Sequence, residues 1–551
     1  MGRRSRANWR GNLRGRKAKN ADHAGAGRGR CETVGGLGRR RPALNALTPA
    51  LQGAQLAEPV RLSDLFGGSV ANENTAARRR ILYVTSEMSD FVKSGGLGDV
   101  SAALPRSLRQ LYDVRVLIPG YRPVTAEHPE IETVARLPAA HGLPAAELGR
   151  LVSADGLTIY VILCPDLYDR EGSPYGDSEG ADFGDNDTRF ARLGLAAAQV
   201  AAGLPDLAWT PDLLHLNDWP SALASAYLAW SGSTVPSVLT IHNLAYQGLF
   251  DRARLPTLGV PDSAFQVEGV EFYGKLSFLK AGIVYASHVT TVSETYAQEI
   301  TTPEFGCGLD GLLRRCAQEG RLTGILNGID ESWDPRTDSS LEASFSPDDW
   351  AGKRSNADDV RRDFGLAVSR GPLFAVVSRL VHQKGVDLTI ESTETIVRQG
   401  GQVVATGRGE PRFEAGLELL AKRYPGQVGV RIGFDEGTAR RMFAGSDFLL
   451  MPSRFEPCGL SQMYAQKMGS LPIARETGGL ADTIKDGVTG FLFREPALAA
   501  MLGAIYRAVD AYGSRRKLNA MRRAAMGQTY AWERSATGYA GVYDRVVGQK
   551  L

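Results

Sequence analysis

The sequence predicts two α/β domains, each built on a doubly wound parallel sheet. Short apolar runs rich in β-branched residues alternate with helical patterns, as in a parallel sheet that is covered on both faces. The alternation stops near residue 330 and then starts again. At 551 residues the chain is long enough for two or more hydrophobic cores. No apolar run is long enough to span a bilayer as a helix, which argues against a membrane-spanning protein.

A basic extension, residues 1–78, precedes the first predicted strand. Its first 45 residues contain 13 Lys or Arg and two acidic residues, a net charge of +11, so the rest of the chain carries −8. Arg, Gly and Ala dominate, and no apolar periodicity is present, so we expect disorder. An Arg-rich, acid-poor amino end is also typical of an organelle transit peptide. Binding to nucleic acid is expected only here, and without sequence specificity.

The first series of elements is predicted to form a domain over residues 79–330. Helical patterns, such as residues 187–203 and 220–230, separate several of its strands. Asp185-Asn186-Asp187 resembles a metal-binding D-x-D, but we interpret Asp187 as the N-cap of the helix that follows. The predicted strands are residues 81–85, 114–118, 157–163, 212–216, 237–241 and 288–292.

The second series is predicted to form a domain over residues 331–528. Turn and linker residues separate it from the first series, beginning at Asn327-Gly328-Ile329-Asp330. The predicted strands are residues 373–378, 402–406, 428–432, 448–451 and 471–474. Ligands of open α/β sheets bind beyond the carboxyl ends of the strands, so two facing sheets would share one binding cleft.

Cations and glycines follow several of these strands. Lys93 stands beside Gly95 and Gly96, whose backbone N–H groups suit a phosphate at a helix start. Arg379 and Lys384 are spaced so that both can reach one diphosphate. A second glycine pair, Gly478 and Gly479, follows a later strand. Each feature alone is ordinary loop chemistry.

Polar and aromatic groups follow two strands of the first series. His215-Leu216-Asn217-Asp218-Trp219 ends one strand, and His242-Asn243 with Tyr246-Gln247 ends the next. This mixture of donors, acceptors and aromatic surface is what a sugar site requires. Five scattered cysteines without a C-x-x-C pair disfavour a zinc ribbon or a disulfide framework and are typical of the cytosol.

Together these segments resemble the bacterial glycogen synthase and plant starch synthase family. The resemblance covers roughly residues 80–547 and rests on five motifs in order. They are K-x-G-G-L at residues 93–97, H-N-x-x-Y-Q-G at 242–248, S-R-x-x-x-Q-K-G at 378–385, P-S-R-F-E-P-C-G-L at 452–460 and T-G-G-L-A-D-T at 477–483.

The resemblance implies a GT-B glycosyltransferase, with two Rossmann-like domains facing each other and residues 529–551 crossing back to the first. It implies transfer of glucose from ADP-glucose to the non-reducing 4-hydroxyl of an α-1,4-glucan such as glycogen, with retention of configuration and without a metal or other cofactor. The implied location is the cytoplasm, or a plastid if residues 1–78 are a transit peptide. No oligomeric state follows from these features.

The resemblance also assigns roles to single residues. Arg379 and Lys384 would hold the diphosphate, Glu456 would face the donor glucose and His242 would lie beside the reacting sugar; these four are the expected catalytic residues. The expected nucleotide-sugar-binding residues are Lys93, Gly95, Gly96, Asp218, Asn243, Gly478 and Gly479.

Three alternatives stay open at this point. Glu456 either forms a covalent glycosyl intermediate or only orients the sugar during same-face attack, which we favour because no paired carboxylate and general acid stand at matching positions. The loop at residues 405–410 departs from the family pattern, so UDP-glucose or a different acceptor is the alternative substrate. A catalytically silent glucan-binding scaffold would have lost the charged motif residues, all of which are present.

Overall fold

A computed structural model describes residues 78–548, and it contains two large sheets. The expected basic extension therefore lies almost entirely outside the described residues. The first sheet has nine strands in the order β12-β11-β7-β6-β1-β2-β5-β4-β3. Its strands are β1 (Arg80–Val84), β2 (Asp113–Pro119), β3 (Glu132–Leu137), β4 (Ala146–Val152), β5 (Thr158–Leu163), β6 (Leu213–Asn217), β7 (Ser237–Ile241), β11 (His288–Thr291) and β12 (Leu322–Gly324).

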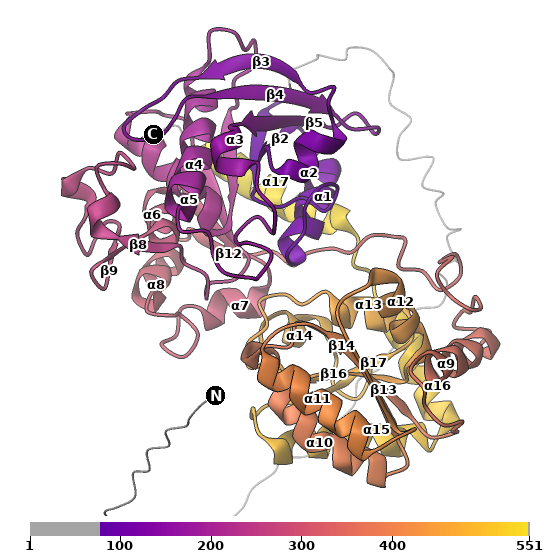
Figure 1. Cartoon of the computed structure of the whole chain (residues 1–551). Coiled ribbons are helices and arrows are strands. Elements are labelled where there is room, and N and C mark those ends of the chain that lie inside the picture. Colours follow the sequence, from indigo (N-terminus) through magenta and orange to yellow (C-terminus); the bar gives the residue numbers. More distant parts are fainter. Residues whose placement is uncertain (1–77, 549–551) are drawn as a thin grey trace, which may run out of the picture. The chain divides into compact units, whose positions relative to one another are not determined.

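Seven neighbouring strands of the first sheet, from β12 to β5, are parallel, whereas β4 and β3 extend the sheet in antiparallel order. The sequence analysis missed both antiparallel strands because it searched for continuous apolar runs. In β4, buried and exposed residues nearly alternate, as expected for a strand with one face in solvent. Figure 1 shows β3 and β4 at one edge of this sheet.

Helices connect the strands of the first sheet and cover it. Helix α4 begins at Asn186, so Asp187 lies in its first turn and not at the N-cap as we expected; the N-cap is Asp185. Asp187 instead accepts a hydrogen bond from its neighbour Thr188 and forms an ion pair with Arg254. The helices are α1 (Gly96–Leu108), α2 (Arg122–Glu127), α3 (Pro165–Tyr168), α4 (Asn186–Ala202), α5 (Asp218–Trp230), α6 (Phe278–Tyr285), α7 (Glu294–Glu299) and α8 (Asp310–Gln318).

The second sheet is entirely parallel, with six strands in the order β15-β14-β13-β16-β17-β18. Its central strands are buried along their whole length, which explains their continuous apolar sequences. The strands are β13 (Leu373–Val377), β14 (Gln402–Gly407), β15 (Val428–Ile432), β16 (Phe448–Met451), β17 (Leu471–Arg475) and β18 (Phe491–Phe493).

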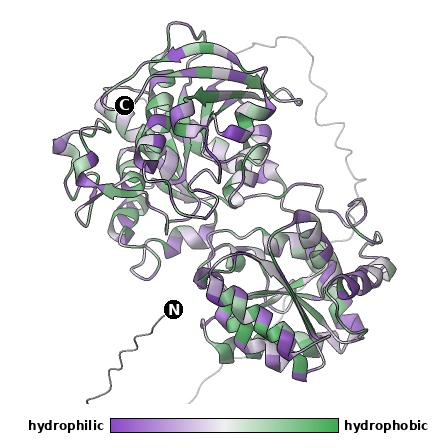
Figure 2. Cartoon of the chain, viewed as in Figure 1, coloured by the Kyte–Doolittle hydropathy of each residue, from purple (hydrophilic) through white to green (hydrophobic). Residues whose placement is uncertain are grey.

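Helices on both faces of the second sheet complete two further apolar clusters. Figure 2 shows that α10 and α11 contain both hydrophobic and hydrophilic residues, as expected for helices with one buried face. The helices of this part are α9 (Ala351–Asp363), α10 (Val386–Arg398), α11 (Pro411–Arg423), α12 (Glu436–Gly445), α13 (Ser461–Lys467), α14 (Gly478–Thr483), α15 (Leu498–Tyr512) and α16 (Arg515–Met526).

The last helix, α17 (Trp532–Gly548), returns to the first sheet. Its Trp532, Tyr539 and Tyr543 are buried in the same apolar cluster as β1 and α1. Figure 1 shows α17 next to α1, far from it in the sequence. The crossing that the resemblance implied for residues 529–551 thus begins just after α16, although the exact domain boundaries stay predictions.

Three short strands form a separate small sheet in the order β8-β10-β9 (Leu249–Asp251, Lys275–Ser277 and Glu271–Phe272). The sequence analysis did not predict it, because strands of two or three residues carry no recognisable period. No helix among residues 78–548 is long and apolar enough to cross a membrane.

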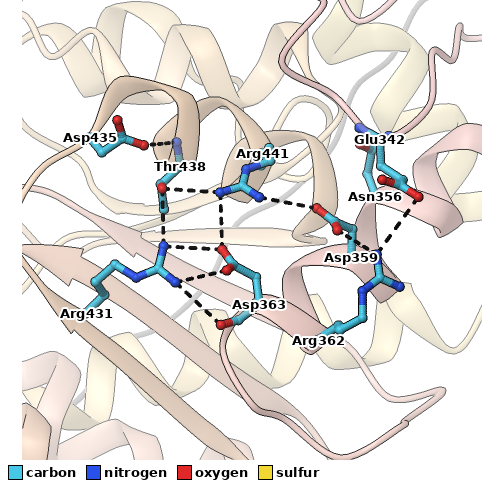
Figure 3. Close-up of polar contacts among 9 residues, drawn as sticks. All are labelled: Glu342, Asn356, Asp359, Arg362, Asp363, Arg431, Asp435, Thr438 and Arg441. Carbon is cyan, nitrogen blue, oxygen red and sulfur yellow. Dashed lines mark hydrogen bonds and ion pairs between the residues drawn. The ribbon is translucent and has the colours of Figure 1, made fainter.

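Ion pairs attach α9 to the second sheet, as Figure 3 shows. The Asp363 carboxylate at the end of α9 lies 3.0 Å from Nη2 of Arg431 in β15 and 3.2 Å from Nη2 of Arg441 in α12. Arg441 also lies 3.7 Å from Asp359, one turn earlier in α9. This network fixes the helix that follows the linker.

Candidate active site

The motif residues lie beyond the carboxyl ends of parallel strands, where open α/β sheets bind ligands. In the first sheet, Asp218 follows β6 and His242 follows β7, and these two strands are neighbours. In the second sheet, Arg379 follows β13 and Glu456 follows β16, which are also neighbours. Each sheet therefore has expected site residues beyond the carboxyl ends of its parallel strands.

The Asp218 carboxylate holds the start of the loop after β7. Its Oδ1 accepts hydrogen bonds from the backbone N–H of His242 at 2.7 Å and of Asn243 at 3.3 Å. Asp218 itself has a φ of 53°, a backbone conformation that non-glycine residues rarely adopt. Burial raises the pKa of Asp218 to about 7, although these two hydrogen bonds favour the charged form. The carboxyl group thus titrates near neutral pH.

The His242 ring is a neutral hydrogen-bonding group at physiological pH. Burial lowers its pKa to about 3, because the charged imidazolium would lose hydration. Nε2 lies 3.0 Å from Oδ1 of Asn217, so the Nε2–H donates to this oxygen and Nδ1 carries the lone pair. His242 can therefore accept a hydrogen bond from a sugar hydroxyl but does not act as a cationic acid.

Lys384 and Glu456 form an ion pair in the second half. Lys384 Nζ donates to Glu456 Oε2 at 2.5 Å, and Ser453 Oγ donates to the same oxygen at 3.0 Å. The Glu456 side chain is only 6% exposed, and that of Lys384 is 17% exposed. Gly385 has a φ of 67°, and a side chain there would strike the carbonyl of Pro452, so glycine lets the two loops approach.

Arg379 contacts the other half of the molecule. Its Nη1 donates to the hydroxyl of Tyr246 at 3.1 Å. Tyr246 belongs to the loop after β7 that also contains His242, and both Arg379 and Tyr246 are exposed. The expected diphosphate ligand of one half thus touches the expected sugar loop of the other.

The late glycine pair is packed tightly at the start of α14. The N–H of Gly478 donates to Glu299 Oε1 and that of Gly479 donates to the carbonyl of Glu456, both at 3.0 Å. A Cβ atom on either glycine would lie 2.0 Å from a backbone carbonyl oxygen. These glycines are therefore required by the fold, and both N–H groups already have protein acceptors.

The early glycine pair is arranged differently. The N–H groups of Ser94 and Gly95 donate to Glu87 Oε2 at 2.6 and 3.0 Å, and Lys93 Nζ lies 2.7 Å from Asp99 Oδ1. Among residues 78–548, the N–H of Gly96 has no backbone or side-chain acceptor. Of the two glycine N–H groups that the sequence assigned to phosphate, that of Gly95 is thus bound to Glu87, and that of Gly96 lies at the exposed start of α1.

Contacts between motifs bring the two halves together. A Cβ atom on Gly96 would lie 3.7 Å from Leu460 Cδ1, at the end of the motif that contains Glu456. Glu299 in α7 reaches Gly478 and also accepts from Thr477 Oγ1 at 2.8 Å. Lys93 lies on the same loop as Gly96, and Asn243 lies on the same loop as Tyr246. Within the described chain, neither side chain forms a hydrogen bond with the second half.

Three residues with contacts to the site were missed by the sequence analysis: Glu87, Tyr175 and Glu299. Glu87 lies in the loop that follows β1, so its position after a strand was an available signal. Tyr175 lies in a long loop before α4 and Glu299 lies inside a helix, so nothing local distinguished them. Tyr246 was quoted within its motif but not assigned a role.

Comparisons with known proteins identify the family. A model of the starch synthase catalytic domain matches residues 80–315, and a model of group 1 glycosyl transferases matches residues 359–525. The glycogen synthase of Pseudomonas putida is 59% identical over 472 residues, which cover 86% of this chain and 91% of that protein. The chain belongs to the glycogen synthase family. Glycogen synthase 1 of Bradyrhizobium diazoefficiens is 57% identical, over 83% of this chain and 99% of that protein.

Solved structures of glycosyltransferases share the fold. The catalytic domain of starch synthase IV from Arabidopsis thaliana, bound to ADP and acarbose, has a TM-score of 0.74 and 30% identity, covering 86% of this chain and all of that one. Sucrose-phosphate synthase from Thermosynechococcus elongatus has a TM-score of 0.54 at 17% identity, which shows the fold alone. This member of the glycogen synthase family is therefore a glucosyltransferase with the GT-B fold, as the sequence predicted.

Proposed function

We propose that the chain transfers glucose from ADP-glucose to the non-reducing 4-hydroxyl of an α-1,4-glucan, with retention of the α configuration. The observation that carries the proposal is the Lys384–Glu456 ion pair, in which the Lys384 side chain is 17% exposed and that of Glu456 is 6% exposed. The carbonyl of Glu456 accepts the N–H of Gly479. Lys384 follows Arg379 by five residues in the motif that is predicted to bind a diphosphate. The ADP and acarbose bound to the Arabidopsis relative are a nucleoside diphosphate and a glucan-like sugar, which supports both substrates.

The cations of the second half would stabilise the leaving group. As the bond between C1 of glucose and the phosphate oxygen breaks, the electron pair goes to the diphosphate. Lys384 and Arg379 place positive charge where this negative charge develops, and such stabilisation is usually the largest contribution to catalysis. To bind the diphosphate, Arg379 would leave the Tyr246 hydroxyl, and Lys384 would share its charge with Glu456.

Glu456 and His242 would orient the donor glucose. Glu456 Oε2 is held by Lys384 and Ser453, which leaves Oε1 for sugar hydroxyls. We propose same-face attack: the acceptor 4-hydroxyl attacks C1 on the side of the departing phosphate and gives its proton to a phosphate oxygen. A trapped glycosyl–Glu456 adduct would instead establish the covalent route.

We further propose that this reaction needs no metal. Arg379, Lys384 and backbone N–H groups would supply the positive charge that a metal ion would otherwise provide at the diphosphate. We propose the cytoplasm as the location, with a plastid as the alternative if residues 1–78 are a transit peptide.

The test is incorporation of label from ADP-glucose or UDP-glucose into glycogen, with and without EDTA. We expect ADP-glucose to be the better donor, the product to be digested by an α-1,4-specific amylase, and EDTA to leave the rate unchanged. Lys384→Ala should lower kcat/KM by about 10²- to 10³-fold. Lys422→Ala, which removes an exposed lysine on α11, should not lower it. Label from neither donor would reject the proposed function.

A further inference from the structure

Glu87 is a buried carboxylate in the loop that follows β1, with a relative exposure of 4%. Its Oε2 accepts the N–H groups of Ser94 and Gly95 at 2.6 and 3.0 Å, and its Oε1 accepts the Tyr175 hydroxyl at 2.6 Å. No Lys, Arg or His of the described chain forms an ion pair with it. Hydrogen bonds alone therefore stabilise its charge, and two of them come from the loop that the sequence assigned to phosphate.

Tyr175 is itself held in place from the other side. Asn186 Nδ2 donates to the Tyr175 carbonyl at 2.7 Å, and Nη1 of the buried Arg189 donates to the Pro174 carbonyl at 2.9 Å. Ser86 Oγ lies 2.9 Å from the Tyr175 hydroxyl. A continuous set of hydrogen bonds thus runs from α4 through the loop at Tyr175 to Glu87, and from Glu87 to the loop before α1.

Glu87 also decides which N–H groups an incoming phosphate can use. A second anion would be repelled from the Ser94 and Gly95 N–H groups while Glu87 occupies them. The Gly96 N–H lies at the start of α1, a helix of 13 residues whose positive end favours an anion. Fixing Ser94 and Gly95 on Glu87 therefore sets the orientation of this next donor.

We propose that Glu87 is a positioning residue for the glucosyl transfer: it holds the loop Lys93–Gly96 so that the Gly96 N–H, and Lys93 beside it, face the donor diphosphate. The inference rests on the proposed function and adds a residue that the motifs did not include. Glu87 does not touch the substrate; it acts through the backbone of the loop.

The test compares Glu87→Ala and Glu87→Gln with the unaltered protein. We expect Glu87→Ala to raise the KM for ADP-glucose, and the Kd for ADP in calorimetry, by about tenfold or more, because two hydrogen bonds to a charged acceptor are lost. The KM for glycogen should change less than twofold. Glu87→Gln keeps one acceptor oxygen and should recover part of the loss. Hydrogen exchange at Ser94 and Gly95 should become faster in Glu87→Ala.

Asp212→Asn is the matched control, because Asp212 accepts the backbone N–H of Arg80 at 2.8 Å at the opposite end of β1. It should lower the melting temperature without changing either KM. Equal ADP affinity in Glu87→Ala and the unaltered protein would overturn the inference alone. The inference would also be overturned if Glu87→Ala raised the KM values for ADP-glucose and for glycogen equally and in proportion to its loss of stability. Failure of ADP to bind the unaltered protein would overturn the proposed donor and this inference together.

Discussion

The two glycine pairs have the same sequence but different physical roles. Gly478 and Gly479 have carbonyl oxygens where a Cβ would be, and Gly478 has a φ of 44°. A Cβ on Gly95 would contact nothing within 4 Å, and one on Gly96 would only touch Leu460. The early pair is therefore not required by the protein's own packing, and the proposed approach of a diphosphate would account for glycine there.

Alanine substitutions should separate the two roles. We expect Gly95→Ala and Gly96→Ala to melt within a few degrees of the unaltered protein but to bind ADP-glucose more weakly. Gly478→Ala and Gly479→Ala should lose about 1–3 kcal/mol of stability through overpacking. Thermal unfolding and the KM for ADP-glucose measure the two effects. Normal KM values for both early variants would contradict a phosphate close to this loop.

The raised pKa of Asp218 predicts a pH dependence of stability. The folded protein binds this proton more tightly than the unfolded chain, since the pKa rises from 3.8 to about 7. The contribution of Asp218 to the unfolding free energy is therefore largest below pH 4 and is lost as the pH rises towards 7. Asp218→Asn removes the titration. Denaturant unfolding of both proteins between pH 4 and 8 should show the difference decline with pH; a constant difference would contradict it.

Helix α9 depends on charge pairs for its attachment to the second sheet (Figure 3). Asp363 bridges Arg431 and Arg441, which come from a strand and a helix. A single partly exposed ion pair contributes little to stability. When a carboxylate is shared by two guanidinium groups, however, removing it breaks two ion pairs at once.

Asp363→Asn should therefore lower the unfolding free energy by about 1 kcal/mol at low salt. The effect should shrink in high salt, because counterions screen the pairs. Asp510→Asn is the control, since Asp510 is exposed and, among residues 78–548, forms an ion pair only with Lys517; we expect almost no change. Chemical denaturation at low and high salt measures both. An effect of Asp363→Asn that is independent of salt would indicate packing instead of charge.

The second half of the chain is connected to the first half at both of its ends. Beyond the linker near residue 330, α17 returns and buries Trp532, Tyr539 and Tyr543 against the first sheet. The Tyr543 hydroxyl is hydrogen-bonded to Nδ1 of the buried His215 at 2.6 Å. Residues from the end of the chain thus complete the core that supports Asp218 and His242.

Removal of α17 should damage the first half and spare the second. A chain that ends at residue 531, just before α17, loses three large aromatic side chains from the first core, each worth about 1.5–3 kcal/mol of burial. The second apolar clusters contain no residue of α17. Calorimetry should show an early unfolding transition for the first half and a nearly unchanged one for the second. A single unchanged transition would contradict this role.

Local sequence patterns determined most of the fold and the choice of site residues. Continuous apolar runs mark buried parallel strands, and the loops after such strands must lie at one edge of a sheet. Position therefore drew attention to the loops of Asp218, His242, Arg379 and Glu456, and the family resemblance assigned their expected roles. The alternating strands β3 and β4, and the very short β9 and β12, were missed because solvent exposure or brevity removes that pattern.

Only the tertiary structure decided which donors of the site are already occupied. Glu299 comes from an element far along the chain from Gly478. Glu87 precedes Gly95 by only eight residues, but no spacing rule predicts that its carboxylate turns back to accept this N–H group. The space around each glycine pair is also decided by the tertiary structure. Gly95-Gly96 and Gly478-Gly479 look alike in sequence, but the carbonyl oxygens that crowd the second pair belong to another loop. The three-dimensional path of the chain sets both properties, and a sequence pattern does not record which side chain turns towards which backbone group.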